Sequence, residues 1–195
     1  MKKLILLLGL SILATACGGG QGGGSSSSKM DVKIGGKDSS LSVKTSGTDN
    51  SVKTFTDVGG KISTATSFYA IMANYDMDLT NIGTMKKPVT AADQMRVMLQ
   101  LIGEEGTDQK TMIKPGIYKA DPSGKFMKID SLTVATFADG KEVRTDFDTM
   151  FSGSKITGQA EVKSVTADLI SGTIDVTEGD KSVKGTFSAK IAVKK

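Results

Sequence analysis

The sequence contains no histidine and no tryptophan, and its 195 residues include one cysteine and three prolines. Without histidine, a Ser-His or Cys-His catalytic relay and histidine ligands for zinc, copper or haem are excluded. A single cysteine cannot form a disulfide within the chain. Composition therefore removes most hydrolase, redox and metalloenzyme mechanisms. Two catalytic routes stay open: a carboxylate pair, or lysine-assisted serine or threonine chemistry.

The sequence also lacks an apolar run long enough to span a bilayer, which needs roughly 20 residues. Its N-terminal run, residues 4–13, follows two lysines and precedes the small residues Ala14, Thr15 and Ala16. A charged start, a short apolar stretch and a small-residue cleavage zone are typical of a secretory signal peptide. We therefore predict a signal peptide at residues 1–16 and no membrane-spanning helix in the mature chain.

The only cysteine, Cys17, directly follows that stretch. The segment Ala14-Thr15-Ala16-Cys17, with Leu13 one place further upstream, resembles the lipobox of bacterial lipoproteins, although Ala14 stands where a Leu-type residue is commonest. The resemblance implies cleavage before Cys17, diacylglycerol on its sulfur and an acylated amino group. Several acyl chains give stable membrane anchoring where one chain does not. The alternative is an ordinary secretory signal that ends in cysteine.

Residues 18–28 contain only Gly, Ser and one Gln. Such a segment behaves as a flexible coil with a reach of roughly 18 Å. The chain thus divides into a signal peptide (1–16), a lipidated cysteine with its tether (17–28) and a globular domain (29–195). Gly18, which is not Asp, is typical of lipoproteins sent to the outer membrane. The resemblance therefore implies a lipid-anchored outer-membrane protein, on either its periplasmic or its cell-surface face.

Charge is nearly balanced, with 25 Lys+Arg against 21 Asp+Glu. The signal peptide holds two of the lysines and no acid, so the mature chain is close to neutral. Lysines and aspartates alternate along the domain without a basic block, apart from Lys194 and Lys195. A nucleic-acid-binding protein usually shows a basic patch or stripe. We therefore expect no nucleic-acid partner.

The domain shows the period-2 alternation of half-buried β-strands, with turn residues between the runs. Residues 156–162, 170–176 and 183–193 each place apolar or glycine residues on one face and polar residues on the other. Residues 169–193 are predicted to form a hairpin around 178–180. A two-residue turn at Asp139-Gly140 fixes a second hairpin, with Leu132 opposite Phe147 on the apolar face. In that register Phe137 falls on the polar face.

Weaker strands are predicted near 30–35, 39–46, 51–58, 66–73, 75–82, 111–120 and 125–130. Residues 90–102 fit either a short helix, with Met95, Met98, Leu99 and Ile102 at helical spacing, or a strand. As a strand, Met95, Val97, Leu99 and Leu101 would face the core, and Gln94, Arg96 and Gln100 would face solvent. The strand is preferred, because the surrounding segments are all β. The predicted fold is all-β: a single antiparallel β-sandwich or a partly closed β-barrel of about ten strands.

Two carboxylate pairs are the candidate catalytic residues: Asp76 with Asp78, and Asp146 with Asp148. Paired acids hydrolyse glycans when they face each other across a cleft, but solvated acids on the polar face of a strand are the preferred explanation of both pairs. No calcium-loop pattern occurs. We therefore expect no catalytic residues, no metal and no cofactor.

Methionine is frequent, and Met72, Met77, Met95 and Met98 raise two further possibilities. Met95 and Met98 could bind copper through their thioethers. All four could line an apolar cavity that carries a lipid, if the strands close. Methionine as core filler is the simpler interpretation. The sequence thus favours a non-enzymatic envelope or cell-surface binding or structural module, with unknown protein, glycan or lipid ligand. The alternatives are a carrier of a hydrophobic ligand and a carboxylate-dependent glycan hydrolase.

Overall fold

The computed structural model describes residues 28–79 and 87–191, which form strands, turns and loops. The strands are β1 (Lys29–Ile34), β2 (Lys37–Ser42), β3 (Thr45–Thr56), β4 (Ile62–Ala73), β5 (Met95–Ile102), β6 (Gly116–Lys119), β7 (Lys128–Ala138), β8 (Lys141–Phe147), β9 (Ile156–Val165), β10 (Leu169–Glu178) and β11 (Lys181–Lys190). Within these two ranges there is no helix that could cross a membrane.

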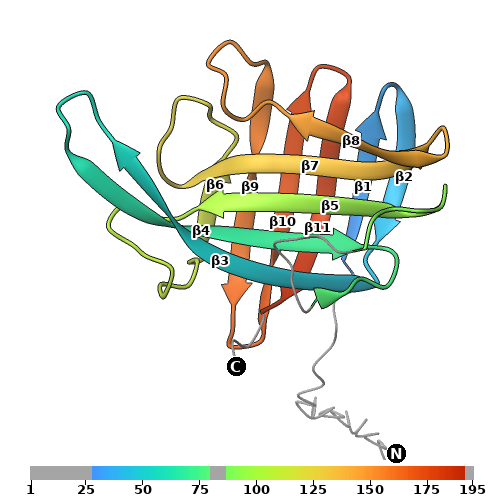
Figure 1. The fold of residues 1–195 in the computed structure, drawn as a ribbon, viewed down its shortest axis with the longest axis horizontal. Helices are drawn as coiled ribbons and strands as arrows, with labels where there is room; N and C mark the ends of the chain where they lie inside the picture. The colour runs from blue at the N-terminus through green and yellow to red at the C-terminus, as the bar shows by residue number, and fades with distance from the viewer. Residues whose placement is uncertain (1–27, 80–86, 192–195) are drawn as a thin grey trace, which may run out of the picture.

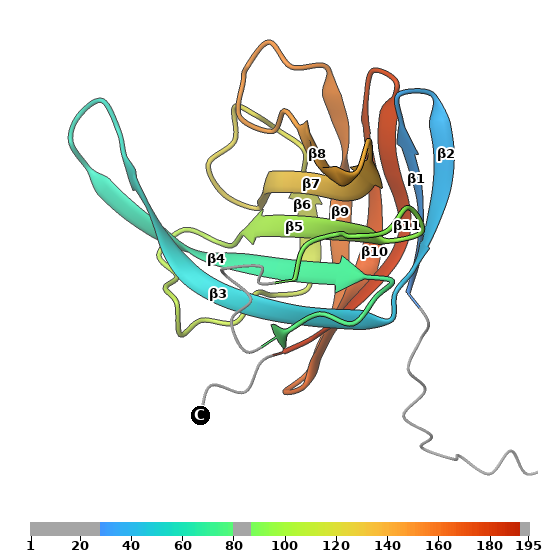
Figure 2. The ribbon, with the colours of Figure 1, turned by 45° about the vertical axis from the view of Figure 1, so that its right-hand side comes forward.

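All eleven strands belong to one sheet, in the order β2-β1-β11-β10-β9-β6-β7-β5-β4-β3, with β8 beside β7. The described neighbours are antiparallel except β6 and β7, which meet in parallel at Lys119 and Lys128. The sheet folds over on itself, so that β3, β4, β5, β7 and β8 cross in front of β1, β2, β9, β10 and β11 (Figure 1; Figure 2). The ends of the sheet, β2 and β3, are not joined by a ladder. The predicted all-β, sandwich-like fold is confirmed, and the sheet is not closed into a barrel.

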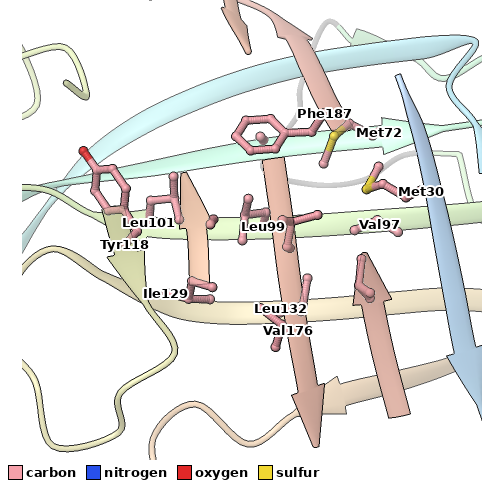
Figure 3. Close-up of a cluster of buried hydrophobic side chains, with 14 of the residues drawn as sticks. Met30, Met72, Val97, Leu99, Leu101, Tyr118, Ile129, Leu132, Val176 and Phe187 are labelled. Atoms are coloured by element: carbon pink, nitrogen blue, oxygen red, sulfur yellow. The ribbon is translucent and has the colours of Figure 1, made fainter. Parts of the chain in front are cut away.

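The core fills the space between the two crossing halves. Its members come from the inner face of nearly every strand, and they include Met30, Met72, Leu99, Leu132 and Phe187, all at most 2% exposed. Figure 3 shows these side chains meeting from opposite halves of the sheet. Burial of this apolar surface is the main favourable term in folding. Side chains from both halves therefore pack against one another in the interior of the described part of the chain.

At Gly158 the backbone of β9 lies very close to the backbone of β10. Its φ is +107°, and a Cβ there would lie 1.9 Å from the backbone oxygen of Asp175 on β10. Only glycine tolerates both conditions. Gly172 of β10 is similar, since an added Cβ would lie 2.0 Å from the Glu161 oxygen and 2.8 Å from the Phe187 ring. The glycines in the predicted apolar faces are thus sites where strands approach closely.

Both predicted hairpins form, and the one at Asp139-Gly140 has the expected register. Leu132 lies opposite Phe147 and Ala138 opposite Lys141, and both turn residues, Asp139 and Gly140, have positive φ. In the second hairpin, β10 and β11 pair from Leu169–Lys190 to Glu178–Lys181.

The preferred strand within residues 90–102 is confirmed: 95–102 form β5, 90–94 belong to a loop, and the alternative helix is absent. Two weaker predictions fare less well. The predicted strand at 75–82 is wrong over its described part, since residues 75–79 lie in the connection that follows β4. The predicted strand at 111–120 shrinks to the four residues of β6.

Candidate functional site: the groove beside β1 and β2

A groove of about 540 Å³ lies at the β2 end of the sheet, on its outer face. We call it the β1–β2 groove, and its lining residues are Asp31, Val32, Lys33, Asp38, Ser39, Ser40, Ser182 and Lys184. The alternation of β1 explains this lining, because Met30 and Val32 enter the core while Asp31 and Lys33 point to solvent. Apart from the buried Val32, the lining consists of exposed or half-buried side chains of neighbouring strands.

Two rows of side chains cross the groove. Asp38 on β2 lies opposite Lys33 on β1, which lies opposite Ser182 on β11. In the second row Ser40 lies opposite Asp31, and Asp31 lies opposite Lys184. Charges of opposite sign alternate along both rows, and the serines leave space between them.

Most of these charges are unpaired. Within residues 28–79 and 87–191, Asp31, Lys33 and Asp38 take part in no hydrogen bond or ion pair through their side chains. Lys184 pairs with Asp175 at 3.0 Å, and both side chains are more than half exposed. Exposed pairs of this kind contribute little to stability. The charges of the groove are therefore available to a ligand.

The outer face of the other half of the sheet is covered. The connection between β4 and β5, described at 74–79 and 87–94, lies over it and packs Tyr75 and Val89 against Ala73 and Ala135. Phe137, the residue that did not fit the predicted register, packs against this small cluster. We call this surface the covered face.

Arg96 of β5 holds the connection in place from below. It is 1% exposed, and its guanidinium donates to the Tyr75 hydroxyl at 3.0 Å, the Lys87 carbonyl at 3.1 Å and Glu142 Oε1 at 3.0 Å. Its Nε has no partner among the described residues. The sequence interpretation placed Arg96 on a solvent-facing side, and that was wrong, because the connection buries it.

Glu142 is the acidic partner in this cluster. It also accepts from Arg144 Nε at 2.7 Å and from the backbone N–H of Val89 at 2.8 Å. Burial alone would raise the pKa of Glu142, but these hydrogen bonds and the charge of Arg96 together hold it below its ordinary value of 4.5. Burial raises the pKa of Tyr75, and the nearby guanidinium of Arg96 opposes that shift.

A second charged cluster ties β3 to β7. Lys53 Nζ lies 2.6 and 2.7 Å from the two oxygens of Asp130. Lys128 is buried and donates to the Thr149 carbonyl at 3.2 Å, and burial lowers its pKa. Each of these three charged groups has a partner within the domain, and the contacts tie separate elements together, so the cluster is structural.

The two candidate acid pairs lie on different elements of the fold. Asp76 lies beyond the end of β4 in an exposed ion pair with Lys44, and Asp78 lies in the same connection. Asp146 is on β8, where it accepts from Thr133, and Asp148 accepts from the backbone N–H of Phe151 in the β8–β9 loop. In the sheet, β5 and β7 separate β4 from β8. Within the described part of the chain, no group of three or more acidic or cysteine side chains could hold a metal ion.

The methionines do not line a common cavity. Met72 and Met95 point into the core, whereas Met98 is on the opposite face of β5 and Met77 packs against the covered face. Met95 and Met98 cannot share a ligand from opposite faces of one strand, so the copper hypothesis and the four-methionine cavity are both wrong.

At the far end of the core, burial raises the pKa of Tyr118 to about 12, and its hydroxyl donates to the Lys114 carbonyl at 2.8 Å.

Sequence reasoning missed the residues of the β1–β2 groove, because Asp31, Lys33 and Asp38 look like ordinary polar-face residues of two weak strands.

The predicted lipidation site, Cys17, lies outside the described residues. No protein family, curated protein or solved structure matches this chain.

Proposed function

We propose that this protein is a lipid-anchored, non-enzymatic binding module of the bacterial cell envelope. Cys17 carries the acyl chains in the outer membrane, residues 18–28 form the tether, and the β-domain binds its partner through the β1–β2 groove. The observation that carries this proposal is the contrast between a core of packed apolar side chains and an outer groove in which Asp31, Lys33 and Asp38 have no side-chain partner among the described residues.

Each alternative has less support. A carrier of a hydrophobic ligand needs an enclosed apolar space, but the inner faces of the two halves are filled by core side chains such as Met72, Leu99 and Phe187. A glycan hydrolase needs two acids across a cleft, and the candidate acids lie on separate elements with partners of their own.

Anchoring is tested by fractionating bacteria that express the wild type or Cys17→Ser after labelling with palmitate. We expect the wild type to be labelled and to sediment with outer membranes, and the variant to be unlabelled and released. Retention of an unlabelled variant in the membrane fraction would show that the anchor is wrongly assigned.

Binding is tested in the same bacteria with the wild type and an Asp31→Lys/Lys184→Glu double variant. The envelope or external components that each protein captures are compared. These substitutions reverse charges in the groove without touching the core, so the melting temperature serves as a folding control. Equal capture by both proteins would remove the groove from the proposal.

A further inference from the structure

Three described strands, β2, β3 and β8, have only one neighbour in the sheet. An edge strand leaves a row of N–H and C=O groups unpaired and can accept another strand. At two of these edges other segments of the chain make contacts. On β8, Lys181 donates to the Asp146 carbonyl at 2.9 Å and Glu178 accepts from the Asp148 N–H, just past the strand, at 3.0 Å.

The edge of β3 is approached by two other segments. The backbone N–H of Lys190 lies 3.4 Å from the Ser46 hydroxyl, and the Asn50 side chain donates to the Gln109 carbonyl. In contrast, β2 hydrogen-bonds to β1 and to nothing else in the described part of the chain. Its residues 37–40 and 42 are exposed, and it forms one wall of the β1–β2 groove.

From this combination we infer that the β1–β2 groove binds an extended peptide segment that adds as a strand to β2. This inference rests on the proposed function, since it names the class of partner that the groove receives. Strand addition takes its affinity from main-chain hydrogen bonds and its specificity from alternate side chains. The open edge of β2 supplies main-chain groups for the hydrogen bonds, and the two rows of charged side chains supply the specificity.

The charges specify the peptide. An added strand would place a side chain opposite Asp38, which already has Lys33 on its other side, so a basic residue there continues the alternation of charge. Two residues along, the next side chain on the same face lies opposite Ser40. Because serine is short and strands are about 4.8 Å apart, a long basic side chain can reach across it to Asp31. The partner is therefore an extended segment with Lys or Arg at two positions separated by one residue.

The probe is a nine-residue peptide, acetyl-Thr-Val-Thr-Arg-Thr-Arg-Thr-Val-Thr-amide, and its control carries Glu in place of both Arg. Binding to the β-domain is followed by the amide NMR signals of residues 37–42. We expect the Arg peptide to shift these signals and to bind at least about tenfold more tightly than the Glu peptide. An Asp31→Lys/Asp38→Lys variant should reverse that preference. Equal binding of both peptides, or no binding up to about 1 mM, would overturn the inference.

Two proline variants separate strand addition from simple charge attraction. In an antiparallel pair, successive residues direct their N–H groups alternately toward and away from the neighbour. Proline at one of Ser39 and Ser40 therefore removes a bond to β1 and lowers stability, while proline at the other removes only an outward donor. We expect the variant of unchanged stability to lose peptide binding by at least about tenfold.

The outcomes distinguish this inference from the proposed function. If charge reversal abolishes binding but the stable proline variant binds normally, the groove is a binding site and strand addition is wrong. If the peptide fails while capture by the protein still depends on Asp31 and Lys184, the proposed function stands with a different partner. If neither peptide binding nor capture responds to charge reversal, both are wrong.

Discussion

The two outer faces of the sheet begin from similar sequence patterns and end in different states. The covered face carries Arg96, Glu142 and Arg144 on alternate strand positions, and the open face carries Asp31, Lys33 and Lys184 in the same way. The β4–β5 connection buries Arg96 and most of Glu142, and hydrogen bonds link both to the exposed Arg144, while nothing in the described chain lies over the second set. Charged residues on one face of a strand therefore serve structure or recognition according to whether a loop covers them.

The largest expected effect concerns the close backbone approach of β9 and β10 in the half of the sheet that carries the open face. Gly158→Ala should destabilise the domain by more than about 4 kcal/mol, because the added Cβ meets the Asp175 oxygen in a backbone conformation that alanine avoids. Gly60→Ala is the matched control, with φ +78° but no atom within 4 Å, and it should cost only about 1–2 kcal/mol. Similar losses in denaturant unfolding would contradict the close approach of β9 and β10.

The covered face should be the next most sensitive. Glu142→Gln leaves the buried Arg96 without its carboxylate, and we expect the free energy of unfolding to fall by about 3 kcal/mol. An Arg96→Met/Glu142→Leu double variant should recover part of that loss, because an apolar pair needs no desolvation of charge. A Glu142→Gln protein as stable as the wild type would mean that the cluster does not hold the connection.

Acid should weaken the covered face selectively. Since the pKa of Glu142 is lowered in the folded state, its contribution to stability is present above the unfolded value near 4.5 and is lost as the pH falls through the folded value. We expect the stability difference between the wild type and Glu142→Gln to be constant from pH 7 to about 5 and to shrink below about 4.5. A difference that grows on acidification would contradict the assignment.

The open face should show the smallest effect. Asp175→Asn breaks the ion pair between Asp175, whose side chain is 69% exposed, and Lys184, whose side chain is 52% exposed. Because exposed ion pairs contribute little, the free energy of unfolding should change by less than about 0.5 kcal/mol. A loss of 2 kcal/mol or more in chemical denaturation would show that the outer charges of this half are structural, and the contrast between the faces would fail.

The sequence predicted those features that depend on residues near one another. Alternation and the Asp139-Gly140 turn gave the β8 pairing residue by residue, because a two-residue turn and one buried face leave a single register. The core positions of β10 and β11 followed for the same reason.

Features that depend on distant segments were not predictable in this way. No local pattern indicates that the connection after β4 returns over β5 and β7, so Arg96 was assigned to solvent and Phe137 had no explanation. The β1–β2 groove depends on β11, far along the chain, coming beside β1. The Cys17 interpretation is of another kind, since it comes from a resemblance to lipoprotein signals and concerns residues outside the described ranges.

Site-specific photocrosslinking on intact cells tests the central claim most directly. A photoreactive amino acid replaces Ser40 in the open groove or Arg144 beside the covered face, both exposed positions on outer strand faces. The account predicts a discrete crosslinked product from position 40, lost when Asp31 and Asp38 are changed to Lys, and none from position 144. A product from position 144 alone would contradict it and would place recognition on the other half of the sheet.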